Sequence, residues 1–378
     1  MLNMINANFY IIIIGSFLLA IIFEMMLLPR LIYIAKKKRL FDLPDSRKKH
    51  NMPIPRLGGM SFVPIIITIT VFSVFIRYKL GLWSESPFED VLPELMLLIC
   101  GMFLIYMLGA KDDLVGVNFK YKFLIQAIAS LFIISSGVYI KNLDGLLGIY
   151  EVPVFIGIPI SILIIVYTTN AINLIDGADG LASGLSFIAF MTYGILFIAA
   201  GLWTYATMAF IICGLLIPFF YYNFFHPSRK IFMGDTGSLT LGYLLSFMML
   251  RLFNTHIEGF CFPSSEGGCI LIIIAALYVP LYDAVRVMLV RLLTKRSPFS
   301  PDRSHIHHKL IDLGLSRRKA VFSIIIFGII FMLLTYLMTF YLNSTIICII
   351  GIIASILIAL SLIKVTKEKR LDAHIMDK

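Results

Sequence analysis

The sequence predicts an all-α integral membrane protein, a polytopic bundle of about eleven transmembrane helices. The first observation is composition: apolar residues make up 59% and charged residues 14% of the 378 residues. Soluble domains average about 45–50% and about 25%. The mean hydropathy is +0.93. A soluble fold cannot hide that much apolar surface, and the same figures exclude a disordered, collagen-like or coiled-coil chain.

The second observation is a series of apolar runs, each long enough for a helix to cross a bilayer, which takes about 20 residues. In chain order these runs cover residues 8–34, 58–77, 91–110, 119–140, 153–170, 181–201, 203–222, 236–254, 268–293, 320–342 and 344–364. They leave no room for a separate soluble domain, so we expect one polytopic domain over residues 1–378. Pro280 is expected to kink the ninth helix, because proline removes a backbone hydrogen bond.

The third observation is the distribution of charge. If the N-terminus lies outside, 28 of the 32 Lys and Arg residues fall in cytoplasmic loops, helix ends and the C-terminal tail. The positive-inside rule therefore predicts an outside N-terminus and a cytoplasmic C-terminus. It also accounts for the net charge of +10 without any binding of nucleic acid.

The polar, motif-like stretches fall on this same predicted cytoplasmic side. We expect the active site to be built from loops 35–57, 111–122, 170–181, 223–238 and 294–319. The predicted outside loops carry few titratable groups. Any chemistry is therefore expected to face the cytosol.

Carboxylates are prominent in three of these loops: Asp112 with Asp113, Asp176 with Asp179, and Asp235 in Gly-Asp-Thr-Gly. Five carboxylates near one membrane face repel each other unless a cation neutralises them. Aspartate and asparagine oxygens suit Mg²⁺, or Mn²⁺, which commonly use one or two protein carboxylates together with phosphate and water. The alternative is that these residues are helix caps and turns, which are common places for Asp and Asn.

A basic cluster near the C-terminal end contains Arg303, His305, His307 and His308. Arginine offers a bidentate fork for phosphate, and histidine donates to phosphate oxygens or relays protons. A histidine-rich tract that binds a transition metal is the alternative.

Two features inside the apolar runs have no part in this chemistry. Asp283 and Arg286, three residues apart, are expected to form a salt bridge across one helical turn. Glu24 is a carboxylate in the first span, where it costs roughly 2.5–3.5 kcal/mol at mid-bilayer and is a functional suspect. The pattern assigns no role to Glu24.

Glycines at positions such as Gly177, Gly180, Gly234 and Gly237 surround the acidic residues and allow backbone N–H groups to approach phosphate. Together with the carboxylates and the basic cluster, they favour transfer of a phosphorylated group from a soluble donor to a membrane-embedded acceptor. A transporter is the rival from another class. It is disfavoured because transporters keep polar groups near the midplane, whereas here they lie at one face.

The motifs, in this order, resemble those of the polyprenyl-phosphate N-acetylhexosamine-1-phosphate transferases. They are DD at 112–113, NAINLIDGADGL at 170–181, GDTGS at 234–238 and RSHIHH at 303–308. The resemblance covers nearly the whole chain, including PIPRLGG at 53–59. Gly116 and the HIHH sequence favour the branch that uses UDP-GlcNAc or a related UDP-HexNAc, with phospho-MurNAc-pentapeptide transferase as the alternative.

The resemblance implies transfer of HexNAc-1-phosphate, with GlcNAc-1-phosphate favoured, from a UDP-sugar to undecaprenyl phosphate at the cytoplasmic face of a bacterial inner membrane. Mg²⁺, with Mn²⁺ as an alternative, is the implied cofactor. The product would begin a surface glycan such as lipopolysaccharide O-antigen, teichoic acid or another cell-wall polymer. A lipid-binding groove and a homodimer are also implied. Single displacement is expected, with a covalent aspartyl intermediate as the alternative.

The resemblance also implies roles for individual residues. The catalytic group is Asp112, Asp113 and His307, and the metal group is Asp235 with Asn173. The residues expected to contact substrate are Asn170, Asn173, Asp176, Asp179, Phe232, Arg303, His305 and His308. Phe232 is expected to stack on uracil and Asp179 to contact its edge, while Arg303 and the histidines hold the donor diphosphate.

Overall fold

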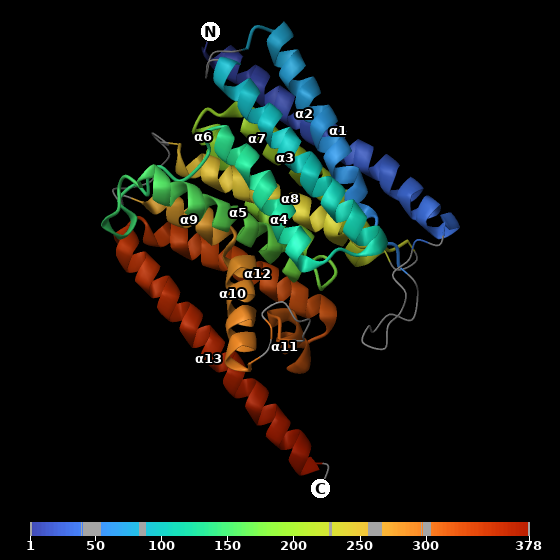
Figure 1. Ribbon diagram of the computed structural model, residues 1–378, viewed down its shortest axis with the longest axis vertical. Coiled ribbons are helices and arrows are strands. Elements are labelled where there is room, and N and C mark those ends of the chain that lie inside the picture. The colour runs from blue at the N-terminus through green and yellow to red at the C-terminus, as the bar shows by residue number, and fades with distance from the viewer. Residues whose placement is uncertain are drawn as a thin grey trace. The chain divides into compact units, whose positions relative to one another are not determined.

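The computed structural model describes residues 2–38, 40, 54–82, 88–226, 229–255, 267–295, 297 and 304–376 (Figure 1). The named elements of this part of the chain are all helices, as the sequence predicts. The chain divides into two compact units, and each is described by itself. The first comprises residues 1–142 and 151–260, and the second comprises residues 143–150 and 261–378.

The first unit contains eight α-helices among its described residues. They are α1 (Leu2–Lys38), α2 (Phe62–Lys79), α3 (Phe88–Val115), α4 (Phe119–Ser135), α5 (Val154–Ile175), α6 (Leu181–Ala199), α7 (Trp203–Phe220) and α8 (Gly234–Phe253). A 3₁₀ turn, η1 (Gly58–Ser61), leads into α2, and a π-helical turn, η3 (Tyr221–Phe225), follows α7.

The second unit holds a short 3₁₀ turn, η2 (Leu146–Gly148), and five α-helices in its described part. The helices are α9 (Gly268–Ala276), α10 (Tyr278–Leu293), α11 (Ile306–Asp312), α12 (Arg317–Met338) and α13 (Ser344–Met376). Helices α9 and α10 meet at a 71° bend. The bend at Leu277, three residues before Pro280, confirms the expected break in the ninth apolar run.

Nine helices of the described chain are long and apolar enough to cross a membrane, and the bent α9–α10 pair makes a tenth candidate. The protein is thus a multi-pass membrane protein. The apolar run at 119–140 forms α4, whose 17 residues extend only about 25 Å at 1.5 Å per residue. Eleven spans and the orientation of the termini stay predictions, as does a single functional domain over residues 1–378.

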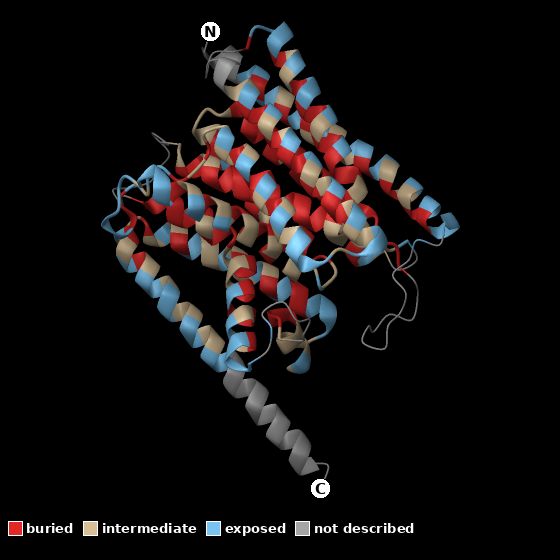
Figure 2. Ribbon diagram, viewed as in Figure 1, coloured by how far each residue is buried: buried red, intermediate tan, exposed pale blue. Residues whose placement is uncertain are grey.

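Helix α8 is the core of the first unit. Of its most apolar 18-residue stretch, 94% is buried, although α8 is the least hydrophobic candidate span. Figure 2 shows the first unit's interior helices as largely buried. Two hydroxyl groups of α8 form hydrogen bonds within the helix: Ser238 Oγ donates to Gly234 O at 2.9 Å, and Thr240 Oγ1 donates to Thr236 O at 2.7 Å. This back-bonding lets small polar residues line a close-packed helix interface inside a membrane protein.

Residues 55–59, which we call the glycine strap, fasten the chain ahead of α2 to the segment ahead of α8. Phe232 N donates to Pro55 O at 2.8 Å, and Gly58 N returns a bond to Phe232 O at 3.0 Å. Gly59 N donates to Met233 O at 2.8 Å. A Cβ at Gly59 would lie 2.1 Å from Gly237 N, so only glycine allows this approach.

Glu24 of α1 anchors the end of the glycine strap from inside the helix bundle. Ser61 Oγ lies 2.9 Å from Glu24 Oε1 and 3.0 Å from Gly58 O, sharing its proton between them. The Glu24 side chain is fully buried, and its Oε2 has no hydrogen-bond partner among the described residues. Ser61 therefore supplies a hydrogen bond to one oxygen of this intramembrane carboxyl group.

Removing one partner of this buried pair is expected to harm the fold more than replacing both. Ser61→Ala should lower the free energy of unfolding by about 1–3 kcal/mol, because it strands the Glu24 carboxyl group. The double variant Ser61→Ala with Glu24→Met should recover most of that loss. Thermal unfolding in detergent checks this. The control is Ser73→Ala, because the Ser73 hydroxyl donates to Thr70 O within its own helix. Equal losses in the single and double variants would contradict the pairing.

Candidate active site

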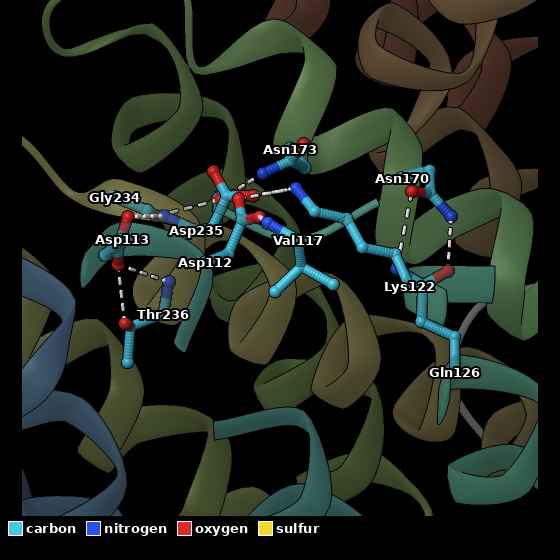
Figure 3. Close-up of polar contacts among 11 residues, drawn as sticks. Asp112, Asp113, Val117, Lys122, Gln126, Asn170, Asn173, Gly234, Asp235 and Thr236 are labelled. Carbon is cyan, nitrogen blue, oxygen red and sulfur yellow. Dashed lines mark hydrogen bonds and ion pairs between the residues drawn. The ribbon is translucent and has the colours of Figure 1, made fainter. Parts of the chain in front are cut away.

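Three helix ends of the first unit bring the predicted acidic and amide residues together. Asp112 and Asp113 occupy the last turn of α3, and Asp235 occupies the first turn of α8. Asn173 comes from the last turn of α5. Figure 3 shows these four side chains converging at one place.

Asp113 caps the start of α8 from a different helix. Its Oδ1 accepts the Asp235 N–H at 2.8 Å, and its Oδ2 accepts Thr236 N at 2.9 Å and Thr236 Oγ1 at 2.6 Å. The first N–H groups of a helix have no intrahelical partner, and a carboxylate there also meets the positive end of the helix dipole. Asp113 thus fixes the turn that carries Asp235.

Gly234 makes this cap sterically feasible. Its φ is +73°, and a Cβ there would lie 2.3 Å from Arg56 O and 2.6 Å from Asp113 Oδ2. Only glycine adopts that backbone conformation without strain and leaves room for the carboxylate. The glycine of Gly-Asp-Thr-Gly-Ser is therefore explained by packing against Asp113.

Asp112 and Asp235 share one ammonium group, that of Lys122 in the first turn of α4. Lys122 Nζ lies 2.6 Å from Asp112 Oδ2 and 2.5 Å from Asp235 Oδ2 (Figure 3). The other oxygen of Asp112 accepts the Val117 N–H at 2.6 Å. Sequence reasoning included Lys122 at the end of the active-site loop 111–122 but gave it no individual role. Its place on the α4 face one turn before Gln126 was the signal that could have pointed to the site.

The two asparagines of the NAINLIDGADGL stretch have different surroundings. Asn173 Nδ2 donates to Ser238 Oγ at 2.9 Å, and its side chain also hydrogen-bonds to Asp235. Asn170 instead pairs with Gln126 of α4: Asn170 Nδ2 donates to Gln126 Oε1 at 2.6 Å, and Gln126 Nε2 donates back at 3.3 Å. In this arrangement Asn170 fastens α5 to α4, a role that the sequence did not predict.

Asp179 and Phe232 are joined by a residue that the sequence analysis passed over, Lys230. Its Nζ lies 2.5 Å from Asp179 Oδ2 and 5.4 Å from the centre of the Phe232 ring. Asn223 supports both segments, because its Oδ1 accepts the Gly180 N–H at 2.5 Å and its Nδ2 donates to Ile231 O at 2.8 Å. The two residues expected to contact a nucleobase therefore do lie close together.

Asp176 follows α5 directly and carries the strongest mark of carboxylate crowding. Burial raises its pKa well above the usual range, and the charges of Asp235, Asp179 and Asp113 raise it further. Burial is the main cause of the elevated pKa, and the neighbouring carboxylates add to it. A group of this kind favours a nearby cation.

The histidine cluster lies in the second unit, and Asp283 organises it. His305 Nδ1 lies 2.8 Å from Asp283 Oδ2, while Asp283 Oδ1 accepts Arg286 Nη2 at 2.7 Å and the Ile306 N–H at 3.0 Å. The expected Asp283–Arg286 pair is confirmed, and its link to His305 is an addition. Arg303 lies outside the described residues.

His307 is buried beside the other two histidines, with ring centroids 5.8 Å from His305 and 4.2 Å from His308. Neither ring nitrogen has a hydrogen-bond partner among the described residues. Burial lowers the pKa of His307 to about 3, and its histidine neighbours act in the same direction. The imidazole is therefore neutral at pH 7, and its one N–H is buried without a partner among the described residues.

The residues around Asp235 fit a hard divalent cation. Asp112, Asp235 and Asn173 supply oxygen atoms, the donors that Mg²⁺ and Mn²⁺ prefer. No group of three or more His, Cys, Asp or Glu placed to hold a metal occurs in the described chain. One or two carboxylates suffice when substrate phosphates complete the coordination, and the Lys122 ammonium marks the place where positive charge is favoured.

Comparisons with known proteins show the family of the chain. Residues 95–253, which contain the carboxylates and asparagines, match the family described as Glycosyl transferase family 4. A relative in Bacillus subtilis (strain 168), named "Probable undecaprenyl-phosphate N-acetylglucosaminyl 1-phosphate transferase", is 34% identical over 321 residues, which cover 84% of this chain and 83% of the relative.

Two further relatives are named undecaprenyl-phosphate alpha-N-acetylglucosaminyl 1-phosphate transferase. The protein of Yersinia pestis is 30% identical over 291 residues and that of Escherichia coli (strain K12) is 30% identical over 292 residues. Each match covers 76% of this chain and 73% of the relative. The chain therefore belongs to glycosyl transferase family 4, as its motifs predicted. It is a membrane-embedded member of this transferase family.

Asp113→Asn is expected to destabilise the protein. Asparagine replaces one of the two acceptor oxygens with an NH₂ group, which cannot accept a hydrogen bond. A backbone N–H at the start of α8 therefore loses its partner, which lowers the free energy of unfolding by about 1–3 kcal/mol. Thermal unfolding in detergent measures the loss. Asp179→Asn is the control, since it loses only the part-exposed ion pair with Lys230, typically about 0–1 kcal/mol. Equal shifts for the two variants would argue against the capping role.

His307 is expected to make the fold sensitive to acid. The unfolded chain binds a proton there below about pH 6.5, but the folded state does not until about pH 3. Stability is therefore unaffected above pH 7 and falls as pH drops below 6.5, by about 1.4 kcal/mol at pH 5.5. His307→Gln should remove this component, measured as the difference in unfolding between pH 7.5 and 5.5. His226→Gln is the control, and an unchanged pH dependence in His307→Gln would refute the assignment.

Proposed function

We propose that the protein transfers GlcNAc-1-phosphate from UDP-GlcNAc to undecaprenyl phosphate, giving undecaprenyl-diphosphate-GlcNAc and UMP. The observation that carries the proposal is the convergence of Asp112, Asp235 and Asn173 at three helix ends of a membrane protein. Relatives covering most of the chain are named as transferases of this kind. A transporter is not supported, because its polar groups would lie near the middle of broken helices.

The reaction is a single displacement at phosphorus. A non-bridging oxygen of the acceptor phosphate forms a bond to the β-phosphorus of the donor. The bond between that phosphorus and the bridging oxygen breaks, and UMP leaves with the electron pair. Because a phosphate monoester has a second pKa near about 6, most of the acceptor is already dianionic at pH 7. Asp112 therefore positions the acceptor and removes a residual proton.

Asp235 and Asn173 would hold Mg²⁺ or Mn²⁺, which when bound neutralises the diphosphate and the leaving group. Asp113 keeps Asp235 in place through the α8 cap. Phe232 stacks on the uracil ring, and Asp179 accepts from its edge. Lys230, which lies against both side chains, moves toward the donor phosphates as the base enters.

The motif resemblance assigns the donor diphosphate to the basic cluster of residues 303–308. Arg303 provides a bidentate fork, and His305, oriented by Asp283, donates from its other nitrogen. His308 and the neutral His307 donate hydrogen bonds to phosphoryl oxygens as charge gathers there. The site faces the cytoplasm of a bacterial inner membrane, where UDP-sugars are made, and its product starts a surface glycan.

The deciding measurement identifies the nucleotide released by purified protein in detergent with undecaprenyl phosphate, UDP-GlcNAc and Mg²⁺. We expect UMP, abolished by EDTA and lowered at least about a hundredfold by Asp235→Ala. Glu151→Ala, an exposed carboxylate between α4 and α5, should retain the activity of the unaltered protein.

Release of UDP would mean glycosyl transfer and would overturn the mechanism. Trapping of a phosphosugar on an aspartate would replace single displacement with a covalent route. Absence of UMP from UDP-GlcNAc, with UMP released from UDP-MurNAc-pentapeptide or another UDP-HexNAc, would change the sugar while leaving the reaction class intact.

A further inference from the structure

The ammonium group of Lys122 occupies the position where positive charge is most needed in the site. It contacts Asp112 and Asp235 at once, at 2.6 and 2.5 Å, and both carboxylates are largely shielded from solvent. Figure 3 shows the Lys122 side chain reaching from α4 to the two carboxylates. The inference drawn from this contact rests on the proposed metal site at Asp235.

The contact occupies one oxygen of each carboxylate and leaves Asp112 little freedom to bind a second cation. Asp112 Oδ1 is already bonded to the Val117 N–H, so Oδ2 is the oxygen that faces inward, and it is the one on Lys122. Asp235 Oδ2 is the matching oxygen on the other side. A divalent cation bound at Asp235 Oδ2 would take the place of the ammonium group.

Lys122 is also built to move while its helix stays fixed. One turn further along α4, Gln126 is buried and makes the reciprocal amide pair with Asn170 of α5. That pair holds the backbone of α4 against α5. The lysine side chain, with four flexible carbons and a 20% exposed surface, can withdraw without any movement of α4.

We propose that Lys122 is an internal counter-cation that pairs with Asp112 and Asp235 and competes with the divalent metal for Asp235. Without substrate it neutralises the carboxylate pair and weakens metal binding. The metal binds when Lys122 withdraws, and the donor diphosphate then supplies a new anion for the displaced ammonium. Metal and donor therefore bind together, and the metal alone binds weakly.

The charges support this exchange. Two carboxylates with Lys122 carry a net charge of −1, and addition of a divalent cation alone would bring the group to +1. Held at the same carboxylates, the Lys122 ammonium group and a divalent cation repel each other, and an anion that enters with the metal offsets this repulsion. The diphosphate of the donor is such an anion, so donor binding removes the obstacle to metal binding.

The test measures Mn²⁺ binding to the full-length protein in detergent, with no nucleotide or lipid present, from the electron paramagnetic resonance signal of free Mn²⁺. Lys122→Met should bind Mn²⁺ at least about tenfold more tightly than the unaltered protein. This is the factor expected if the lysine occupies the carboxylates about 90% of the time, because apparent affinity scales with the competent fraction.

Lys230→Met is the matched control. Lys230 forms an ion pair of the same 2.5 Å length and the same 20% lysine exposure, but with Asp179 instead. The substitution Lys230→Met removes the same charge as Lys122→Met. It therefore measures the gain in Mn²⁺ affinity that comes from net charge alone, which we expect to be less than about threefold. Lys122→Met combined with Asp235→Asn should lose the tighter binding.

Unchanged or weaker Mn²⁺ binding by Lys122→Met, or an equal gain in Lys230→Met, would overturn the competition. If Lys122→Met does not yield folded protein, Lys122→Gln, which keeps a hydrogen-bond donor to the carboxylates, takes its place under the same criteria. Tighter Mn²⁺ binding by Lys122→Met, together with no UMP formation by the unaltered protein, would leave the competition standing and refute the proposed function. UMP formation without tighter binding would refute the competition alone.

Discussion

The site depends on a helix cap that is supplied by another helix. Asp113 of α3 satisfies the first N–H groups of α8, and this one carboxylate joins the two helices whose ends carry Asp112 and Asp235. A cap made by a neighbouring residue in sequence would stabilise α8 without placing it against α3. Because the cap comes from α3, the same contact stabilises the start of α8 and places Asp235 beside Asp112. Gly234 permits this contact because it leaves room for the Asp113 carboxylate.

Much of the architecture could be predicted from sequence because membrane helices follow composition. Long apolar runs predict helices, and the lipid environment leaves backbone polar groups no alternative. The run at 119–140 shows the limit of that rule. It forms a helix of only 17 residues, because apolar composition extends into the following turn beyond Ser135, and hydropathy cannot detect where a helix ends.

Within the site, the acidic residues could be predicted and their partners could not. Asp112, Asp235 and Asn173 stand in short, distinctive motifs, whereas Lys122 and Gln126 occur on an apolar helix without one. Their importance comes from how α4 is rotated against its neighbours, a tertiary property that spacing alone does not encode. His305 illustrates the same point in the second unit, since its partner Asp283 is 22 residues away and was expected only to pair with Arg286.

The burial of α8 has a consequence for how the protein meets its bilayer. Hydrophobic mismatch acts on helices through the surface they offer to acyl chains, and it is relieved by tilt or local thinning. In the first unit, only 28% of the most apolar 18-residue stretch of α1 is buried, whereas 94% of the corresponding stretch of α8 is buried. Changes in bilayer thickness are thus taken up by outer helices such as α1. Helix α8, which carries Asp235, has little contact with acyl chains. The geometry around Asp235 is therefore set by protein packing and should stay constant across membranes of different lipid composition.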